Sequence, residues 1–197
     1  MELHGRYKTL IEEVAKRKPL TIVEIGTHAG NSAIAMVDEA REHNRKGVFY
    51  YGFDIFEMAD KNHKEFMKKE FNGKKPVILG EVTKRLKSNG IKHKLLVGKS
   101  ESTLKKFSPD RFIDFVFIDG GHSIETIEND WNQIKYLMDK NTVVIFDDYY
   151  ENRDDFGCKK LIDKLKKTYR YNIEKLDPIE KIEKNNIIVR LVKVTKI

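Results

Sequence analysis

Five short apolar runs in this sequence each end on an acid or a glycine, and helical patterns separate most of them. The runs and the residues that follow them are 20–25 before Gly26, 48–53 before Asp54, 95–97 before Gly98, 112–118 before Asp119, and 142–146 before Asp147. Short, nearly continuous apolar strands that alternate with helices are typical of a parallel sheet covered on both faces. The pattern therefore predicts an α/β protein with three layers, in which a mostly parallel sheet lies between two layers of helices.

Apolar residues at helical spacing fill the segments between these runs. We expect helices at residues 31–43, 100–107, 123–138 and 156–169, with Ser123 as the N-cap of the third. Two further strands, 171–176 and 187–194, close the chain, and the link 177–186 suits an antiparallel hairpin. We expect a single domain over residues 1–197, with an N-terminal helix at 2–18 and a helical insertion at 57–91 that acts as a lid.

Bulk properties narrow the class of protein. The chain has 197 residues and 40% hydrophobic content, which suffices for the core of one domain. Cys158 is the one cysteine of the sequence, which excludes an intramolecular disulfide and a cysteine-based zinc site. No apolar run approaches the roughly 18 residues of a membrane span, and the N-terminal segment lacks the apolar centre of a signal peptide. We therefore expect a cytoplasmic protein with no membrane partner.

The net charge of +7 raises the question of a nucleic-acid partner. Nine of the 38 basic residues are arginine and the other 29 are lysine, scattered among glutamates without an arginine cluster. Arginine is the usual bidentate reader of phosphate and guanine, so this pattern favours a solvated lysine- and glutamate-rich surface. A nucleic-acid partner stays an alternative to a small-molecule acceptor.

In an open α/β sheet, ligands bind beyond the carboxyl ends of the strands, where the five acids and glycines meet. The stretch VEIGTHAGNS places Gly26 and Gly30 at a turn from strand to helix, with His28 between them. Its spacing is looser than the GxGxxG of dinucleotide sites, which suits a ligand without phosphates. Asp54, at the end of the next strand, is placed to accept hydrogen bonds from both hydroxyls of a ribose.

Asp119, Asp147 and Asp148 follow two strands that we expect to be neighbours. Gathered carboxylates repel one another, and a divalent cation relieves that repulsion. Oxygen ligands without cysteine favour Mg²⁺, with Mn²⁺ or Ca²⁺ as alternatives. The alternative to a metal site is that Asp147 and Asp148 cap a turn. His122, three residues after Asp119, is the candidate general base, because histidine accepts protons near neutral pH.

These segments resemble those of a known family. VEIGTHAGNSA, YYGFDIF, GKSEST, FVFIDGGHSIETIENDW and VVIFDDYY are similar to motifs of class I S-adenosylmethionine-dependent methyltransferases, above all the small metal-dependent O-methyltransferases of the macrocin and catechol type. The resemblance implies a Rossmann-like fold, a seven-stranded sheet of order 3-2-1-4-5-7-6 with the last strand antiparallel, and S-adenosylmethionine as cofactor with Mg²⁺ or another divalent cation.

The resemblance also assigns residues to sites. It implies a cofactor site at Glu24, Gly26, Thr27, His28, Gly30, Ser32, Asp54, Gly98, Lys99, Ser100 and Asp119, and a metal site at Asp119, Asp147 and Asp148. The chain departs from the family at the position of the catalytic base. The catechol type has lysine at the place of His122, and the macrocin type has aspartate at the place of Gly121. We therefore expect His122 and Asp119 to be the catalytic pair.

The expected activity is metal-assisted O-methylation of a small hydroxylated molecule, such as one with vicinal oxygens. Two alternatives remain: an RNA methyltransferase with the same cofactor site, and a metal-dependent hydrolase or binding protein on the same scaffold. The N-terminal helix either covers the active-site edge or contributes to a homodimer, and the sequence leaves that choice open.

Overall fold

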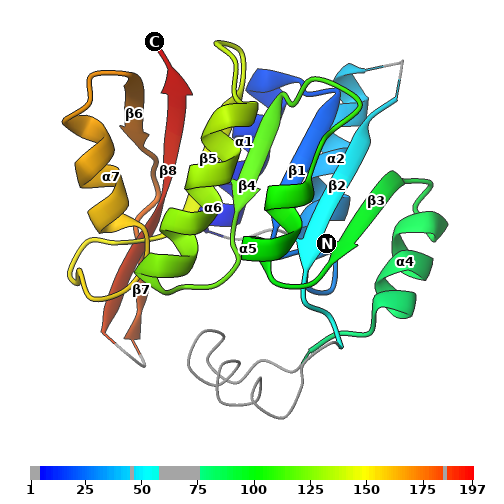
Figure 1. Cartoon of the computed structure of the whole chain (residues 1–197), viewed down its shortest axis with the longest axis horizontal. Coiled ribbons are helices and arrows are strands. Elements are labelled where there is room, and N and C mark those ends of the chain that lie inside the picture. The colour runs from blue at the N-terminus through cyan, green and yellow to red at the C-terminus, as the bar shows by residue number, and fades with distance from the viewer. Residues whose placement is uncertain (1–4, 45–46, 58–75, 184–185) are drawn as a thin grey trace.

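The computed structural model describes residues 5–44, 47–57, 76–183 and 186–197. Within these residues, one sheet has the strand order β3-β2-β1-β4-β5-β8-β6, and the short strand β7 also pairs with β8 (Figure 1). The strands are β1 (Thr21–Ile25), β2 (Phe49–Asp54), β3 (Lys92–Val97), β4 (Phe115–Ile118), β5 (Val143–Tyr150), β6 (Tyr171–Lys175), β7 (Glu180–Ile182) and β8 (Ile187–Lys196). Strands β1 to β5 are mutually parallel, and β8 is antiparallel to its neighbours. The expected α/β fold and strand order are confirmed, with β7 as an addition.

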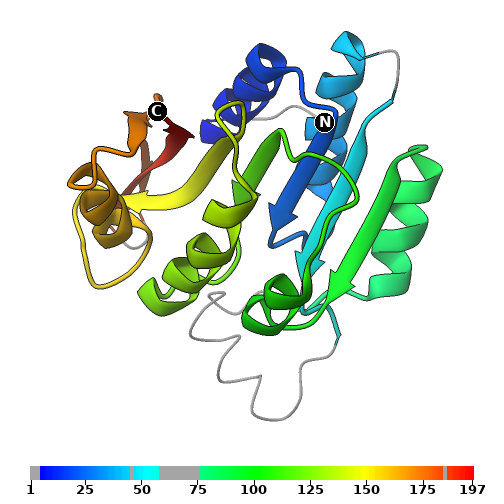
Figure 2. The same cartoon turned by 45° about the horizontal axis from the view of Figure 1, so that its top comes forward.

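Helices cover both faces of this sheet, which gives the three expected layers (Figures 1 and 2). The described helices are α1 (Arg6–Arg17), α2 (Asn31–His43), α4 (Leu79–Ser88), α5 (Ser100–Thr103), the 3₁₀ turn η1 (Leu104–Lys106), α6 (Ile124–Leu137) and α7 (Lys159–Lys166). Helices α1, α2 and α4 pack on one face, and α5, α6 and α7 pack on the other. None of the helices in the described part of the chain is long and apolar enough to cross a membrane.

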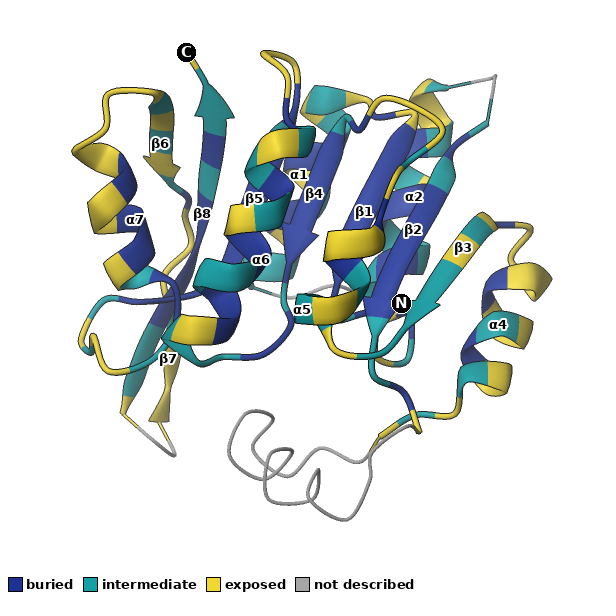
Figure 3. Cartoon of the chain, viewed as in Figure 1, coloured by how far each residue is buried: buried dark blue, intermediate teal, exposed yellow. Residues whose placement is uncertain are grey.

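Alternating residues of each central strand serve two separate apolar cores. In β1, Val23 packs into the core beneath α6 and α7, whereas Ile22 packs into the core beneath α1 and α2. Successive side chains of a strand point to opposite faces, so a strand between two helical layers is apolar at most of its positions. Strands β1 and β4 are accordingly buried along their whole length (Figure 3). This requirement explains why the runs that opened the sequence analysis are continuous rather than alternating.

Several helix boundaries follow the local sequence. Helix α2 occupies residues 31–43 as predicted, and Ser123 caps α6 by accepting the Thr126 amide at 3.3 Å. The helix expected at 156–169 is shorter, because Gly157 adopts φ +78° and α7 begins only at Lys159. The helix expected at 100–107 divides into α5 and η1.

The structure corrects several strand bounds. Strand β3 begins at Lys92 rather than at residue 95, and β4 begins at Phe115 rather than at residue 112. Strand β5 does not end at residue 146 but continues to Tyr150, because Tyr149 and Tyr150 pair with Arg190 and Val189 of β8. A register shift lies between Phe146 and Tyr149, so the acids at 147 and 148 sit at an irregularity inside the strand rather than after it. The link 177–186, expected as a plain hairpin connection, contains β7, which itself forms the hairpin with β8.

The structure describes parts of the two segments expected in addition to the sheet and its helices, the lid and the N-terminal helix. Residues 58–75 of the proposed lid lie outside the described residues, and the remainder of that insertion contains α4, which packs through Val82 and Leu86 on the α2 face. Helix α1 is tied to the sheet at its C-terminal end, where Asp114 accepts the Leu20 and Thr21 amides at 2.9 Å each and pairs with Arg17. These bonds account for the single acid in the apolar run at 112–118.

Candidate active site

A pocket lies at the carboxyl ends of β1 to β4. Its lining is formed by Ile25, Gly26, Phe53, Asp54, Ile55, Gly98, Lys99, Ser100, Glu101, Gly120, Gly121 and Thr126. Five residues predicted to bind a cofactor are therefore brought together: Gly26, Asp54, Gly98, Lys99 and Ser100. This is the place where an open α/β sheet is expected to bind its ligand.

Gly26 allows two loops to meet at the centre of this pocket. Its backbone has φ +97°, and a side chain there would overlap the carbonyl group of Asp119 in the neighbouring loop. The Gly26 amide donates to the Phe53 carbonyl at 2.8 Å, which fixes the turn against β2. Because only glycine adopts this conformation without strain and without a clash, the turn after β1 depends on Gly26.

Two backbone amides hold the Asp54 carboxylate. Oδ2 accepts the amide of His28 at 2.7 Å, and Oδ1 accepts the amide of Phe56 at 2.8 Å. Each carboxylate oxygen has two lone pairs, so each can accept one more hydrogen bond from a ligand in the pocket. His28 therefore serves this site through its backbone, at φ +44°. Paired acceptors held at a pocket wall suit a vicinal diol such as a ribose.

A buried polar network supports the glycine turn from below. Glu24 is fully buried and accepts hydrogen bonds from the hydroxyls of Ser32 and Tyr50, and Tyr50 lies 3.0 Å from the Thr27 hydroxyl. Burial raises the pKa of Glu24 to about 7. Six residues assigned to the cofactor do not line the pocket, and their role in binding it stays a prediction: Glu24, Thr27, His28, Gly30, Ser32 and Asp119. Tyr50 was missed in the sequence, although a hydroxyl within an apolar strand was a usable signal.

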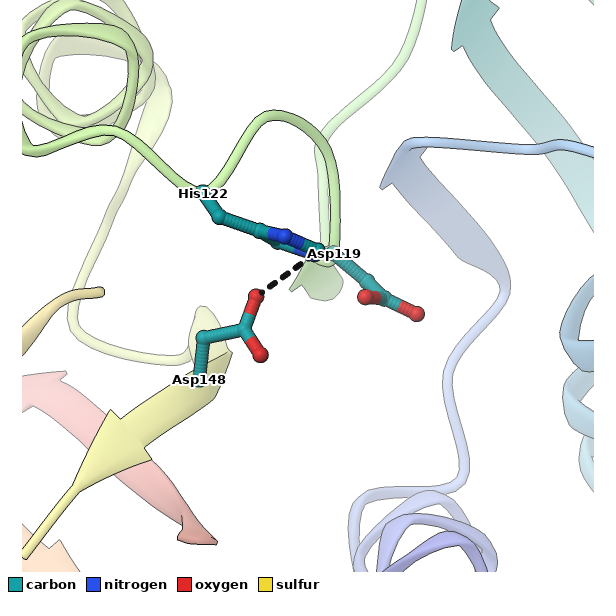
Figure 4. A group of neighbouring side chains, drawn as sticks. All are labelled: Asp119, His122 and Asp148. Carbon is teal, nitrogen blue, oxygen red and sulfur yellow. Dashed lines mark ion pairs between the residues drawn. The ribbon is translucent and has the colours of Figure 1, made fainter. Parts of the chain in front are cut away.

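Next to the pocket, two acids and a histidine converge. One ligand atom each from Asp119, His122 and Asp148 lies within 4.8 Å of the others (Figure 4). His122 Nε2 is 3.1 Å from Asp148 Oδ2, and the Tyr150 hydroxyl donates to Asp148 Oδ1 at 2.7 Å. Burial raises the pKa of Asp148, while the neighbouring His122 acts in the opposite direction. Two carboxylates beside an imidazole are a donor set that fits a divalent cation.

Asp147 is not part of this convergent group. Adjacent side chains of a strand point to opposite sides, and Asp147 turns toward the start of α1, where Arg6 forms a two-point ion pair with it. Asp148 adopts φ +59° at the irregularity of β5 and turns toward His122. The two acids were predicted to bind a metal as one pair, and the structure gives them different partners.

The loop after β5 returns to fix the backbone of this group. The Gly157 amide donates to the His122 carbonyl at 2.8 Å, and the Cys158 amide donates to the Asp148 carbonyl at 3.1 Å. A side chain at Gly157 would overlap the Asp148 carbonyl, so the loop can approach only with glycine there. The Phe156 ring lies edge-on to the His122 ring, with centroids 5.8 Å apart. Both the acid and the histidine are thus held by the loop after β5.

Comparison with known proteins identifies the family. A family model described as a methyltransferase domain matches residues 23–149, well over half of the chain. The chain belongs to this family of methyltransferase domains. The matched segment begins in β1 and ends in β5, so it contains the glycine turn, Asp54 and the convergent group. The methyltransferase family expected from the sequence motifs is confirmed.

Solved structures show the same fold at low identity. The O-methyltransferase TomG from Streptomyces achromogenes, involved in tomaymycin synthesis and solved with SAM, has a TM-score of 0.69 at 16% identity, covering 96% of this chain and 79% of its own. An O-methyltransferase from Bacillus cereus in complex with SAH has a TM-score of 0.68 at 16% identity, with coverages of 99% and 83%. An rRNA methylase from Streptococcus thermophilus has a TM-score of 0.66 at 14% identity, with coverages of 100% and 99%. This methyltransferase domain therefore shares its architecture with enzymes named for different acceptors.

A curated relative is an uncharacterized protein of Acanthamoeba polyphaga mimivirus, 24% identical over 162 residues. The match covers 77% of this methyltransferase domain and 61% of the viral protein. The chain thus spans less than two thirds of that relative's length.

Proposed function

We propose that this methyltransferase domain transfers the methyl group of S-adenosylmethionine to a hydroxyl oxygen of a small molecule. The observation that carries the proposal is that one loop serves both sites. Gly120 and Gly121 line the pocket, while Asp119 and His122 on either side of them belong to the convergent group. A ligand in the pocket would therefore lie directly beside the acids and the histidine.

On the pocket side, the chain's own groups suit a nucleoside. Asp54, held by two amides, would accept the two ribose hydroxyls. Gly98 to Ser100 would border the nucleobase. The backbone at Gly26 would contact the end of the ligand nearest to β4. The neighbours solved with SAM and SAH support this choice of cofactor.

On the other side, Asp119 and Asp148 would hold a divalent cation, Mg²⁺ or a related ion. When bound, such an ion orients vicinal oxygens and lowers the pKa of a hydroxyl that coordinates it. Asp148 holds the His122 ring through Nε2, and the Gly157 amide fixes the His122 backbone. The chain thus offers an oriented proton acceptor beside two carboxylates.

The reaction requires the acceptor oxygen to lie in line with the methyl carbon, at about 3 Å. The acceptor oxygen forms a bond to the methyl carbon as the bond from that carbon to sulfur breaks, and S-adenosylhomocysteine leaves. His122 takes the hydroxyl proton. Because His122 and the pocket share one loop, the acceptor and the methyl donor are brought to the same edge of the sheet.

The decisive experiment is calorimetric titration with S-adenosylhomocysteine, with and without Mg²⁺. Wild-type protein is expected to bind in the micromolar range, and Asp54→Ala is expected to lose about 100-fold or more, because two charge-assisted hydrogen bonds disappear. Asp110→Ala, which removes an exposed acid in the loop before β4, is the matched control. Absence of binding by wild-type protein would overturn the proposal and revive the hydrolase and binding-protein alternatives.

An RNA acceptor is the second candidate. The net charge of +7 favours it, as does the match over 99% of the rRNA methylase chain from Streptococcus thermophilus. Titration of a structured RNA at increasing salt separates the two candidates, since phosphate contacts make the affinity fall steeply with salt. A panel of vicinal diols and catechols, assayed for methyl transfer, tests the favoured candidate directly.

A further inference from the structure

The start of α1 reaches the acids at the sheet edge from the opposite end of the sequence. Arg6 Nε lies 2.7 Å from Asp147 Oδ1, and Arg6 Nη2 lies 3.0 Å from Asp147 Oδ2. The Tyr7 hydroxyl lies 3.0 Å from Asp119 Oδ2 and 3.3 Å from Asp147 Oδ2. Two consecutive residues of α1 therefore touch two of the three acids that the sequence analysis assigned to the metal.

These contacts use most of the acceptor capacity of Asp147. A carboxylate offers about four lone-pair positions. Asp147 Oδ1 accepts Arg6 Nε and the Asp148 amide, the latter at 2.8 Å, while Oδ2 lies within bonding distance of Arg6 Nη2 and the Tyr7 hydroxyl. The side chain is also 1% exposed and paired with a cation of full charge. Because the one hydrogen of the Tyr7 hydroxyl is nearer to Asp119, Asp147 keeps at most one lone pair for a metal ion, and Arg6 offsets its charge.

Arg6 is itself anchored by the additional strand β7. Its guanidinium pairs with Glu180, and its backbone amide donates to Glu180 Oε1 at 2.6 Å. Arginine keeps its charge at all ordinary pH values, and both of its carboxylate partners lie within ion-pair distance. Arg6 therefore stays charged and remains between the two acids.

Tyr7 is placed to orient Asp119. Its ring lies edge-on to Phe117 of β4, with centroids 6.3 Å apart, and the Arg6 guanidinium lies 5.0 Å from its centroid. A phenol hydroxyl has one hydrogen to donate, and the Tyr7 hydroxyl lies nearer to Asp119 Oδ2 than to Asp147 Oδ2. The hydroxyl is thus held in a fixed position against one oxygen of Asp119.

We propose that Arg6 and Tyr7 are positioning residues of the metal centre: Arg6 holds Asp147 out of the ion's coordination, and Tyr7 orients Asp119 toward the ion bound with Asp148. The inference rests on the proposed function, because it concerns the same cation site. It assigns to α1 a role in building that site, in addition to covering a face of the sheet.

Mn²⁺ alone, titrated calorimetrically and followed by its paramagnetic resonance, tests the proposal without any acceptor. Tyr7→Phe removes one hydroxyl and is expected to weaken Mn²⁺ binding about 10-fold, as loss of a group that orients a metal ligand commonly does. Tyr51→Phe is the matched control, since it removes a hydroxyl that bonds to Asp110 away from the pocket. Melting temperature and S-adenosylhomocysteine affinity should be the same in both variants.

Substitution of the acids gives the second arm. Asp119→Asn and Asp148→Asn are expected to weaken Mn²⁺ binding at least about 10-fold, whereas Asp147→Asn keeps it within about threefold. Equal losses for Asp147→Asn and Asp119→Asn would overturn the role of Arg6, and unchanged Mn²⁺ affinity in Tyr7→Phe would overturn the role of Tyr7. Wild-type protein that binds S-adenosylhomocysteine but not Mn²⁺ would overturn the cation part of the proposed function, and the inference with it.

Discussion

The pocket side and the acid side of this active-site edge are built in different ways. Asp54 on the pocket side is held by backbone amides 26 and 2 residues away in the chain. On the acid side, Asp147 is held by Arg6 across 141 residues, and Asp119 by Tyr7 across 112 residues. The first arrangement is part of the turns that end β1 and β2, whereas the second requires α1 to be docked against the sheet.

The difference affects how each side responds to substitution. Backbone amides remain when a side chain changes, so the pocket side is sensitive mainly at its glycines and at Asp54 itself. The acid side depends on side chains from α1, β5, β7 and the loop after β5, and each can be removed singly. We therefore expect single substitutions to affect one side without the other. Some should abolish cofactor binding, and others should change cation binding or turnover alone.

The largest effect is expected at the proton acceptor. His122→Gln should reduce turnover by about 10²- to 10⁴-fold, the usual contribution of a general base, with S-adenosylhomocysteine affinity unchanged. His43→Gln, on the exposed side of α2, is the control and should behave as wild type. Mn²⁺ titration adds a second readout: affinity retained within about threefold supports a base, whereas a loss of about 10-fold or more would make His122 a metal ligand instead.

The second effect tests the pocket side at its turn. Gly26→Ala should lower S-adenosylhomocysteine affinity by about 100-fold and reduce stability by about 1–3 kcal/mol, because the new methyl group overlaps the Asp119 carbonyl at a φ that alanine disfavours. Gly80→Ala is the control, since nothing lies within 4 Å of a side chain at that position in α4. It should be neutral or slightly stabilising. Wild-type affinity in Gly26→Ala would show that the turn is not the rigid element described here.

The pocket side was easier to predict from the sequence than the acid side. Strand positions, the glycine turn and Asp54 were predictable, because each is encoded in a run of neighbouring residues whose pattern is set by burial on both faces. Asp119 and His122 were predictable for the same reason, since both directly follow β4. The extent of β5 was not, because pairing with Arg190 and Val189 of β8 extends the strand past two acids that locally suggest its end.

The partners on the acid side carried no signal in the chain. Arg6 lies in an ordinary basic N-terminal segment, and only the docking of α1 places it beside Asp147. The separation of Asp147 from Asp148 follows from the alternation of side chains in a strand together with the irregularity at Asp148. If β5 ended at residue 146, both acids would lie in a loop. The alternation of side chains that separates them in a strand would then not apply.

A smaller, pH-dependent effect is expected beneath the pocket side. Burial raises the pKa of Glu24 to about 7 from an ordinary value of 4.5, so between these values the unfolded chain loses a proton that the folded chain keeps. Stability should therefore be highest below pH 4.5, fall by about 3 kcal/mol as the pH rises to 7, and then level off with respect to this group. Glu24→Gln removes that loss, so its melting temperature relative to wild type should rise between pH 5 and pH 8.

Glu42→Gln, an exposed substitution on α2, is the control for Glu24 and should show no such trend. A constant difference between Glu24→Gln and wild type at both pH values would mean that Glu24 is ionised in the folded protein. In that case the hydrogen bonds from Ser32 and Tyr50 would outweigh burial and hold the charge of Glu24.

The smallest effect concerns the end of the sheet remote from both sites. Asp114→Ala removes the acceptor of the Leu20 and Thr21 amides and the partner of Arg17, at a partly exposed position. The expected cost is about 1 kcal/mol of stability, measured by urea unfolding, because the amides can turn to water. Arg17 anchors the last turn of α1, whereas Arg6 and Tyr7 lie in its first turn. If Mn²⁺ affinity fell in Asp114→Ala while the fold persisted, docking of the whole of α1, rather than the two side chains at its start, would control the metal centre.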